Sequence, residues 1–322
     1  MSSSFDDATV RTLNELTSAF YAREAASFSA TRQAPWQGWC QAFSAIAEVD
    51  PDFSSRPLSV LDLGCGNLRF ERFLAEHVSA PLSAHAIDNC APLAKQAAIG
   101  FPAVLLSAQL DVAPPTHQAS ASSVAPASSA TPESSAAPTL LSSSAPTLPP
   151  ALAASAAGAS SLDFREIDLV DALLESGLHE ALPDGACDLA VAFGVMHHLP
   201  RFDLRAQMLA CLGRSLRPGG FAVISFWQFL DDPRLAAKAE RTTAEGRVAY
   251  QLPSFSPRDA LLPWQHATGI YRFCHHCDEA EINQLVAAAQ LAVPLQEVAR
   301  FSADGKSGTL NRYVVLRIEC AL

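Results

Sequence analysis

The chain has 322 residues, 49% of them hydrophobic, and a formal net charge of -11. This length suits one large domain or two small ones, and the apolar fraction is ample for a core. No segment is basic. Taken alone, this weakens any assignment to nucleic-acid binding, because phosphate contacts need clustered lysine and arginine.

The N-terminal residues MSSSFDDATV are acidic and polar. A secretory signal needs a basic start and an apolar run, and a membrane span needs about 18 apolar residues in succession, which no segment supplies. The sequence therefore predicts a cytoplasmic protein without membrane contact. The eight cysteines are scattered, several of them in apolar runs, and are interpreted as small buried hydrophobic residues in a reducing compartment.

Two helices are predicted at the start of the chain. Apolar side chains recur at helical spacing over Phe5–Phe28, and a second helix follows over Trp36–Val49. Next, the apolar run LSVLDLG (58–64) ends in glycines and predicts a buried parallel strand with a tight turn after it. The helix LRFERFLAEHV (68–78) and the strand LSAHAID (82–88) complete a β-α-β unit.

From Ser107 to Ser161 the sequence is almost entirely alanine, serine, proline and threonine, with no lysine, arginine or aromatic residue. Such a segment buries too little apolar surface to offset the loss of chain entropy. We therefore predict a disordered insertion that interrupts one domain.

Strands and helices alternate again after this segment. This alternation predicts a doubly wound α/β sheet. The expected elements are the strand DFREID (163–168), the helix Val170–His179, the strand CDLAVAFG (187–194), the helix Phe202–Leu216 and the strand FAVISFWQF (221–229).

The end of the chain has a different pattern. The helix DEAEINQLVAAAQL (278–291) precedes two strands, PLQEVARF (294–301) and NRYVVLRIE (311–319). A short turn at Ala303–Gly308 joins them, so they form a hairpin, and we expect the last strand to be antiparallel to the sheet.

The run LDLGCGN has the pattern of a nucleotide-binding turn. Asp62 ends the strand, and Gly64 and Gly66 let the backbone approach a ligand closely and turn its amides toward that ligand. Asp88, at the end of the next strand in AIDN, is placed to accept hydrogen bonds from ribose hydroxyls.

NAD-dependent enzymes share that layout, so the choice of cofactor needs a discriminating feature. The third glycine of the dinucleotide pattern is missing, because Leu68 and Arg69 stand where a pyrophosphate needs small residues. The carboxylate of Asp62, just before the glycines, suits a positively charged amino acid. Both features favour S-adenosyl-L-methionine, and Asp168, at the end of a predicted strand in EIDL, is then expected to bond the adenine amino group.

The segments VLDLGCGN, AIDN, EIDL, CDLAVAFGVMHHL and LRPGGFAVISFW together resemble the successive motifs of the class I S-adenosylmethionine-dependent methyltransferases. The resemblance implies a Rossmann-like sheet of seven strands with the last one antiparallel. It places the domain at residues 51–322, with 107–161 as its insertion and 1–50 as a helical extension on the substrate side. The implied cofactor-binding residues are Asp62, Gly64, Cys65, Gly66, Asp88, Asn89, Asp168, Leu169 and Phe193.

Three further segments, FYAREAASFSATRQAPW, SFWQF with DALLPW, and YRFCHH, resemble the tRNA wobble-uridine carboxymethyl methyltransferases, which esterify 5-carboxymethyluridine. This resemblance implies tRNA as the substrate and a small zinc-binding activator subunit as a partner. The chain departs from that family at Leu68 and Arg69, where Gly-Lys is usual, and at Cys274, which replaces an aromatic residue. The matching residues are Phe28, Ser29, Thr31, Arg32, Trp36, Pro263, Trp264, Arg272, Phe273 and His275.

The implied acceptor is a carboxylate, which is ionised at neutral pH because its pKa is about 4, so the transfer needs no strong base. It needs alignment and a cation, and Arg32 and Arg272 are the candidates, one for the acceptor and one for a phosphate. Trp227 and Trp264 offer stacking faces for an unpaired base. His197 would orient the acceptor or serve as a base. The predicted catalytic residues are Arg32, His197, Trp227 and Arg272.

Structural roles compete with these assignments. His197 can be a core or capping histidine, Arg32 a salt-bridged arginine, and Asp88 or Asp168 a helix cap. At the level of function, a small-molecule O- or N-methyltransferase and an inactive binding module of the same fold stay open. We expect no metal at Cys274–Cys277, because the two adjacent histidines between the cysteines do not easily point to one ion.

Overall fold

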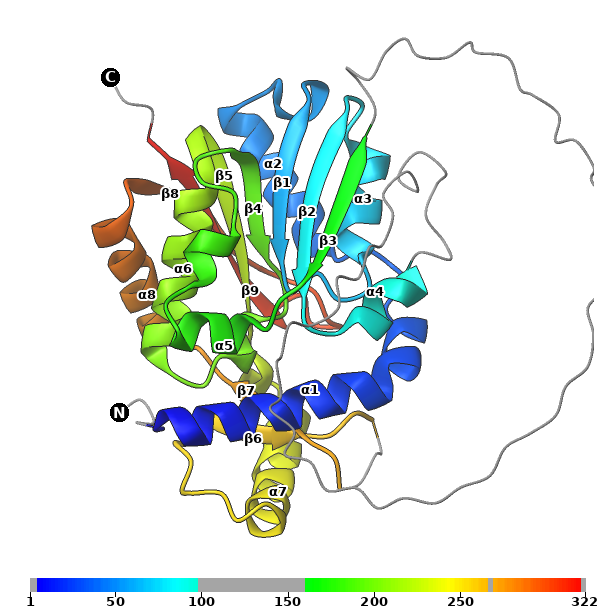
Figure 1. Ribbon diagram of the computed structural model, residues 1–322, viewed down its shortest axis with the longest axis vertical. Coiled ribbons are helices and arrows are strands. Elements are labelled where there is room, and N and C mark those ends of the chain that lie inside the picture. Colours follow the sequence, from blue (N-terminus) through cyan, green and yellow to red (C-terminus); the bar gives the residue numbers. More distant parts are fainter. Residues whose placement is uncertain (1–4, 98–159, 266–268, 320–322) are drawn as a thin grey trace, which may run out of the picture. The chain divides into compact units, whose positions relative to one another are not determined.

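The computed structural model in Figure 1 describes residues 5–97, 160–265 and 269–319. The predicted insertion at 107–161 lies outside these residues except at its last two positions, so its disorder stays a prediction. Within the described residues, no helix is both long and apolar enough to cross a membrane.

Seven strands form the main sheet in the order β3-β2-β1-β4-β5-β9-β8. The first five in this order are parallel, and β9 is antiparallel to both β5 and β8. This confirms the predicted sheet with an antiparallel last strand. The strands are β1 (Leu58–Leu63), β2 (Leu82–Asp88), β3 (Ser161–Glu166), β4 (Cys187–Ala192), β5 (Leu216–Trp227), β8 (Leu295–Ala303) and β9 (Asn311–Ile318).

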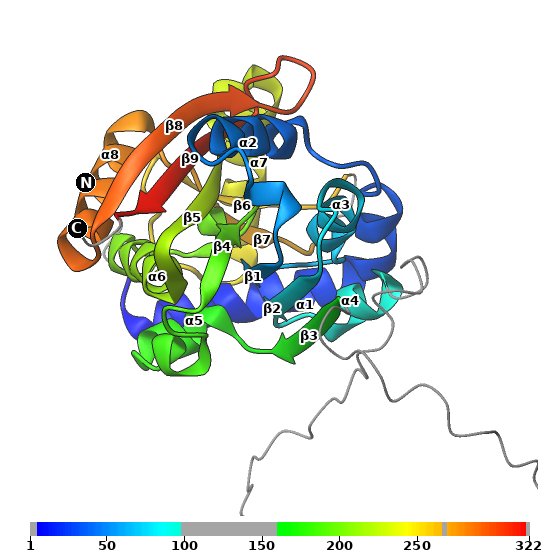
Figure 2. The same cartoon turned by 90° about the horizontal axis from the view of Figure 1, so that it is seen from above.

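Helices cover both faces of this sheet (Figure 2). Helices α2 and α3 pack on one face through one apolar cluster, and α5, α6 and α8 pack on the other through a second. Successive β1 residues serve the two clusters, since Val60 belongs to the first and Leu61 to the second, as strand alternation requires. These helices are α2 (Gln37–Val49), α3 (Arg69–His77), α5 (Leu169–Leu174), α6 (Phe202–Ser215) and α8 (Glu279–Ala292).

Helix α1 (Asp7–Ala30) crosses below the carboxyl ends of the parallel strands (Figure 1). It contacts α4 (Ala91–Ala97), α5 and the strand β7 (Arg272–His275). The amide of Phe273 in β7 donates to Thr17 Oγ1 at 3.1 Å, which fixes the middle of α1. The predicted helix at Phe5–Phe28 is thus confirmed and lies against the end of the sheet where ligands bind in α/β folds.

A second, small sheet was not predicted from the sequence. Strand β6 (Asp259–Leu262) pairs antiparallel with β7, and α7 (Pro233–Ala249) packs against β6. Both strands have only four residues, which is too short for periodicity to indicate a strand. Short 3-10 helices complete the described chain at Phe53–Ser55, Leu178–Ala181, Met196–His198 and Phe229–Asp231.

Three predicted elements have wrong boundaries. The strand expected over 163–168 ends at Glu166, because Asp168 accepts the amides of Val170 and Asp171 and so begins α5. Helix α5 ends at Leu174 and not at residue 179, since Ser176 adopts a φ of 56°. Strand β5 includes the RPGG segment that was expected to precede it, and it ends at Trp227.

Candidate functional site

A cavity of about 460 Å³ lies between the carboxyl ends of the parallel strands and α1. Its wall includes residues from α1, from the turns after β1, β2, β3 and β4, and from the tip of the β8–β9 hairpin. The four predicted catalytic residues and the nine predicted cofactor-binding residues all line it. Segments far apart in the sequence therefore meet at one place, while the role of each residue stays a prediction.

The glycine turn after β1 needs its glycines for conformation and space. Gly64 and Gly66 have φ values of 81° and 57°, in the left-handed region that other residues avoid. A Cβ added at Gly64 would lie 2.8 Å from Cβ of Val195, whereas one at Gly66 would meet nothing within 4 Å. The turn is therefore packed at Gly64 and open at Gly66.

The amides of this turn do not point at a ligand, contrary to expectation. Those of Gly64 and Cys65 donate to the carbonyl of Ile87 at 2.8 and 3.1 Å, and that of Gly66 donates to Asp88 Oδ2 at 2.9 Å. A dinucleotide site needs such amides free for its diphosphate. The turn therefore lacks a free cradle for a diphosphate, in agreement with the preference for S-adenosyl-L-methionine.

Asp88 has one donor on each carboxylate oxygen. Oδ2 accepts from Gly66, and Oδ1 accepts from the amide of Cys90 at 2.8 Å. Burial raises the pKa of Asp88, and the hydrogen bonds from Gly66 and Cys90 oppose this rise. Because each oxygen can accept two hydrogen bonds, Asp88 keeps acceptor capacity for ribose hydroxyls.

Asp168 is placed differently from the prediction. It is the N-cap of α5, where Oδ1 accepts the amides of Val170 and Asp171 at 3.0 and 3.1 Å. Its Oδ2 accepts from the side-chain amides of Asn14 and Asn89 at 2.8 and 3.0 Å. All four lone-pair positions are used, so an adenine amino group would have to displace one of these amides.

Two arginines also line the cavity. Arg272 is 6% exposed, and its Nε and Nη1 have no hydrogen-bond partner among the described residues. Its guanidinium carbon lies 5.6 Å from the ring centre of Trp227 and 5.9 Å from that of Trp264. Arg32 stacks over Phe28 at 4.8 Å and over Trp264 at 5.4 Å. In the described part of the chain, neither arginine forms an ion pair.

This pair of cations has an electrostatic cost without a ligand. Burial lowers the pKa of Arg32, and the charge of Arg272 lowers it further, although Tyr21 acts in the opposite direction. Buried charges without a partner are expensive, and a carboxylate or phosphate offsets that cost through charge-assisted hydrogen bonds. The arrangement can therefore bind an anion between aromatic rings.

The adjacent histidines are both neutral. Burial and the charge of Arg272 lower the pKa of His198 to about 3. Since His198 Nδ1 lies 2.7 Å from the carbonyl of Phe273, it carries the proton, and Nε2 accepts from the Tyr21 hydroxyl at 2.9 Å. Burial, His198 and Arg272 hold the pKa of His197 well below its usual range, and its Nδ1 has no partner.

Arg69 and Tyr21 line the cavity but were not predicted as site residues. Arg69 lies over Trp36 and Trp39 at 4.8 and 5.1 Å, and burial and the charge of Arg32 lower its pKa to about 10. Arg69 has a weak sequence signal, because it stands in GCGNLRF where a small residue was expected. Tyr21 lies in the segment FYAREAASFSATRQAPW, but its place within a regular helix did not single it out.

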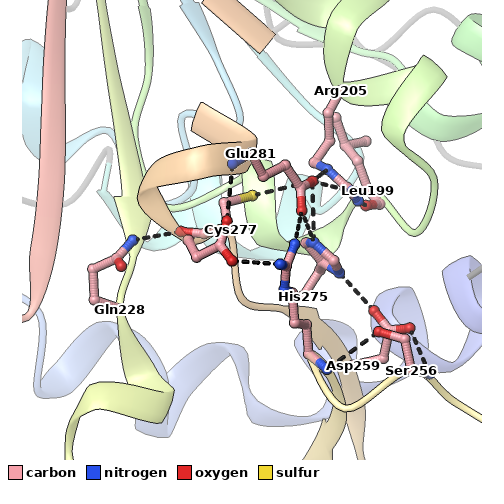
Figure 3. Close-up of polar contacts among 10 residues, drawn as sticks. Leu199, Arg205, Gln228, Ser256, Asp259, His275, Cys277 and Glu281 are labelled. Atoms are coloured by element: carbon pink, nitrogen blue, oxygen red, sulfur yellow. Dashed lines mark hydrogen bonds and ion pairs between the residues drawn. The ribbon is translucent and has the colours of Figure 1, made fainter. Parts of the chain in front are cut away.

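A buried network of charged side chains borders the segment that carries His197 and His198 (Figure 3). Arg205 is 0% exposed, donates to Glu281 Oε1 at 3.0 and 2.6 Å, and also donates to the carbonyl of Leu199, next to His198. His275 donates from Nδ1 to Asp259 at 2.6 Å and from Nε2 to Glu281 at 3.0 Å. The network therefore ties α6, α8 and β7 to the segment that carries His197.

Opposing effects set the charges in this network. Burial lowers the pKa of His275, but the hydrogen bonds with Asp259, Cys277 and Glu281 outweigh it and raise the pKa to about 10. His275, Cys277 and Glu281 converge closely enough to be considered as metal ligands. However, both nitrogens of His275 are bonded to carboxylates, and Arg205 holds Glu281, so the arrangement is complete as an ion-pair network.

Comparison with known proteins agrees with the fold. Residues 29–295 match the family model described as a methyltransferase domain. No curated protein matches the chain.

Solved structures are similar at low identity. An S-adenosylmethionine-dependent methyltransferase from Methanosarcina mazei has 12% identity and a TM-score of 0.48, with 85% of this chain and 98% of that chain covered. The 1,6-didemethyltoxoflavin-N1-methyltransferase of Burkholderia thailandensis has 15% identity and a TM-score of 0.47, with 99% and 93% covered. A complex of the Trm112 methyltransferase activator with a methyltransferase from Haloferax volcanii has 11% identity and a TM-score of 0.45, with 94% and 98% covered.

Proposed function

Because the chain belongs to the methyltransferase-domain family, we propose that it esterifies the carboxylate of 5-carboxymethyluridine at the wobble position of a cytoplasmic tRNA. The methyl donor is S-adenosyl-L-methionine, the cofactor of this family. What is proposed is the acceptor, together with the residues that bind it.

The unpaired arginines carry this proposal. Arg32 and Arg272 lie in the same cavity as the glycine turn, and Trp227 and Trp264 flank them. An anionic group on an aromatic base matches both features, because the guanidinium groups bind the anion and the rings stack on the base. A carboxymethyl uridine in a single-stranded loop combines an anionic group with an unpaired aromatic base.

Methyl transfer to a carboxylate does not require a strong base in the site. When bound, S-adenosyl-L-methionine supplies an electrophilic methyl group. A carboxylate acceptor is already ionised at neutral pH, so no residue of this chain has to remove a proton from it. A neutral His197 carries one ring N–H, which can donate a hydrogen bond to the carboxylate and orient it. One arginine holds the acceptor, and the other is free for a phosphate, because a second cation on the same oxygen would reduce its nucleophilicity.

A partner would help this chain to bind RNA. The net charge of -11 repels a polyanion, so the phosphate contacts needed for a long RNA would have to come in part from elsewhere. We include in the proposal the small zinc-binding activator subunit that the resemblance implies. Affinity purification of the tagged chain, followed by mass spectrometry, tests for a small partner at equal stoichiometry.

Nucleoside analysis tests the acceptor directly. Liquid chromatography of tRNA nucleosides from a deletion strain should show 5-carboxymethyluridine accumulating and its methyl ester lost. Unchanged wobble uridines would contradict the proposal. Transfer of labelled methyl groups to small carboxylic acids, but not to tRNA, would then favour a small-molecule methyltransferase, and failure to bind S-adenosyl-L-homocysteine would favour an inactive binding module.

A further inference from the structure

Glu71 is a buried acid below the glycine turn. It lies in the first turn of α3, is 1% exposed, and neither of its carboxylate oxygens has a hydrogen-bond donor on another described residue. Phe70 and Phe73 beside it belong to the apolar cluster on this face of the sheet. An isolated ionised carboxylate in such a place would cost several kcal/mol or more, so Glu71 needs another way to be neutralised.

Asp62 can neutralise Glu71 by sharing a proton with it. It is 3% exposed, lines the cofactor end of the cavity, and its Oδ1 also has no donor in the described part of the chain. The side chains of Asp62 and Glu71 lie within hydrogen-bonding reach of each other. Two carboxyl groups can share a hydrogen bond only when one proton lies between them, so the pair holds one proton and one negative charge.

The surrounding groups favour this protonated pair. Burial and the charge of Glu71 hold the pKa of Asp62 well above its usual range, and burial raises the pKa of Glu71 to about 7. Asp88, on the neighbouring strand, adds a negative charge that raises both pKa values. Arg72, on the same helix, opposes this for Glu71, and the Cys65 thiol stays neutral because burial raises its pKa.

We propose that Glu71 is a cofactor-positioning residue that shares a proton with Asp62 and releases that proton when the ammonium group of the cofactor binds. The released proton goes to solvent, and Asp62 then meets the ammonium as a carboxylate with Glu71 behind it. The inference rests on the proposed placement of the methionine part of the cofactor at Asp62. It extends that placement, because Glu71 itself does not line the cavity.

The sign of the pH dependence follows from the charges. A bound ammonium favours the ionised form of both acids and so lowers the pKa values of the pair. Binding therefore releases a proton wherever the free protein still holds it, and affinity for the cofactor rises with pH over the range in which the free pair still holds its proton. One released proton corresponds to a change of at most about tenfold in affinity per pH unit.

Calorimetry can count this proton. S-adenosyl-L-homocysteine, which keeps the ammonium group, is titrated into the full chain between about pH 6 and 8 in buffers of different ionisation enthalpy. We expect the release of about 0.5 to 1 proton per ligand near pH 6.5. 5′-Methylthioadenosine lacks the amino-acid part, so its binding should release none.

Variants test whether the Asp62–Glu71 pair, and no other group, releases the proton. Glu71→Gln should bind S-adenosyl-L-homocysteine without proton release and with an affinity nearly independent of pH. Glu76→Gln, an exposed position on the same helix, should behave as the unmodified protein. If Glu71→Gln does not fold, the difference between the two ligands in the unmodified protein still decides the question.

The outcomes distinguish the role of Glu71 from the existence of the cofactor site. Binding of S-adenosyl-L-homocysteine without proton release, or with release that persists in Glu71→Gln, would overturn the role of Glu71 and leave the cofactor site intact. Equal release with 5′-methylthioadenosine would also overturn it. Failure of S-adenosyl-L-homocysteine to bind at all would overturn the cofactor site and the inference with it.

Discussion

At the scale of single residues, the residues predicted for cofactor and acceptor differ in the sign of their charge. Among the residues that line the cavity, Asp62 and Asp88 belong to the predicted cofactor end, and Arg32 and Arg272 belong to the predicted acceptor end. This separation suits a ligand pair in which the donor has an ammonium group and the acceptor is an anion. Substitutions at the two ends should therefore affect different binding constants.

Replacement of Arg32 tests the acceptor end. Arg32→Ala should lower kcat/KM for the acceptor by at least about tenfold, because a charge-assisted hydrogen bond contributes about 1.5 to 3 kcal/mol. The affinity for S-adenosyl-L-homocysteine should stay within about twofold, since Arg32 is predicted not to touch the cofactor. Arg23→Ala, on the exposed side of α1, is the matched control. Full turnover in Arg32→Ala would assign this arginine to packing.

Replacement of Asp88 tests the cofactor end. Asp88→Ala removes the acceptor for the Gly66 amide and the predicted acceptor for the ribose, so affinity for S-adenosyl-L-homocysteine should fall by about tenfold or more. Isothermal titration calorimetry measures this change, with Asp163→Ala on the exposed strand β3 as the control. Unchanged affinity in Asp88→Ala would show that this acid only caps the turn.

At the scale of elements, α1 and β7 form the side of the cavity that the parallel sheet does not supply. Strand β7 presents Arg272 to the cavity, and alternation places Phe273 and His275 on its other face. The Thr17–Phe273 hydrogen bond joins α1 to this strand. A change in either element should therefore move the arginine that is predicted to bind the acceptor.

The link between α1 and β7 can be weakened without a change of shape. Thr17→Val leaves the buried amide of Phe273 without an acceptor, which should cost about 1 to 3 kcal/mol of stability. We also expect Thr17→Val to raise the KM for the acceptor more than the KM for the cofactor. Thr12→Val, at an exposed position of the same helix, is the control in both denaturation and kinetics. Equal stability of the two variants would contradict the proposed link.

The His275 network predicts a specific pH dependence of stability. The folded-state pKa of about 10 lies above the ordinary value of 6.5, so protonated His275 stabilises the fold fully below about pH 6.5. This contribution is lost as the pH rises toward 10, at up to about 1.4 kcal/mol per pH unit. Urea denaturation of the unmodified chain and of His275→Gln should show this slope only in the former. His179→Gln, an exposed position, should retain the slope.

At the scale of the whole molecule, the described residues outside the predicted insertion contain the seven-stranded sheet, its two helical layers and the full lining of the cavity. Residues 111–158 belong to the predicted insertion and lie outside the described residues. We expect that replacing them with a Gly-Ser linker of roughly 12 residues leaves the thermal midpoint within about 2 °C. Loss of folding or of cofactor binding would show that this segment is part of the domain.

The sequence predicted the fold well wherever the signal was local. Apolar residues lie together between turns around Val60 to Asp62, in the segment that ends at Asp88 and in the CDLAVAFG run. This pattern indicated three strands, and the structure confirms them. Strands β6 and β7 were missed because four residues give no period. The adenine-binding role of Asp168 stays a prediction, and its side chain caps a helix, the competing role, and binds two asparagines.

The sequence by itself determined the cofactor end, because the glycines and acids there follow consecutive strands whose ends must meet at one edge of a parallel sheet. Only the tertiary structure brought Arg32, Trp227 and Arg272 into that cavity, since they come from distant segments. Only burial leaves the oxygens of Glu71, Oδ1 of Asp62 and two nitrogens of Arg272 without a hydrogen-bond partner among the described residues. Desolvation and pairing depend on distances between segments, and sequence spacing does not contain those distances.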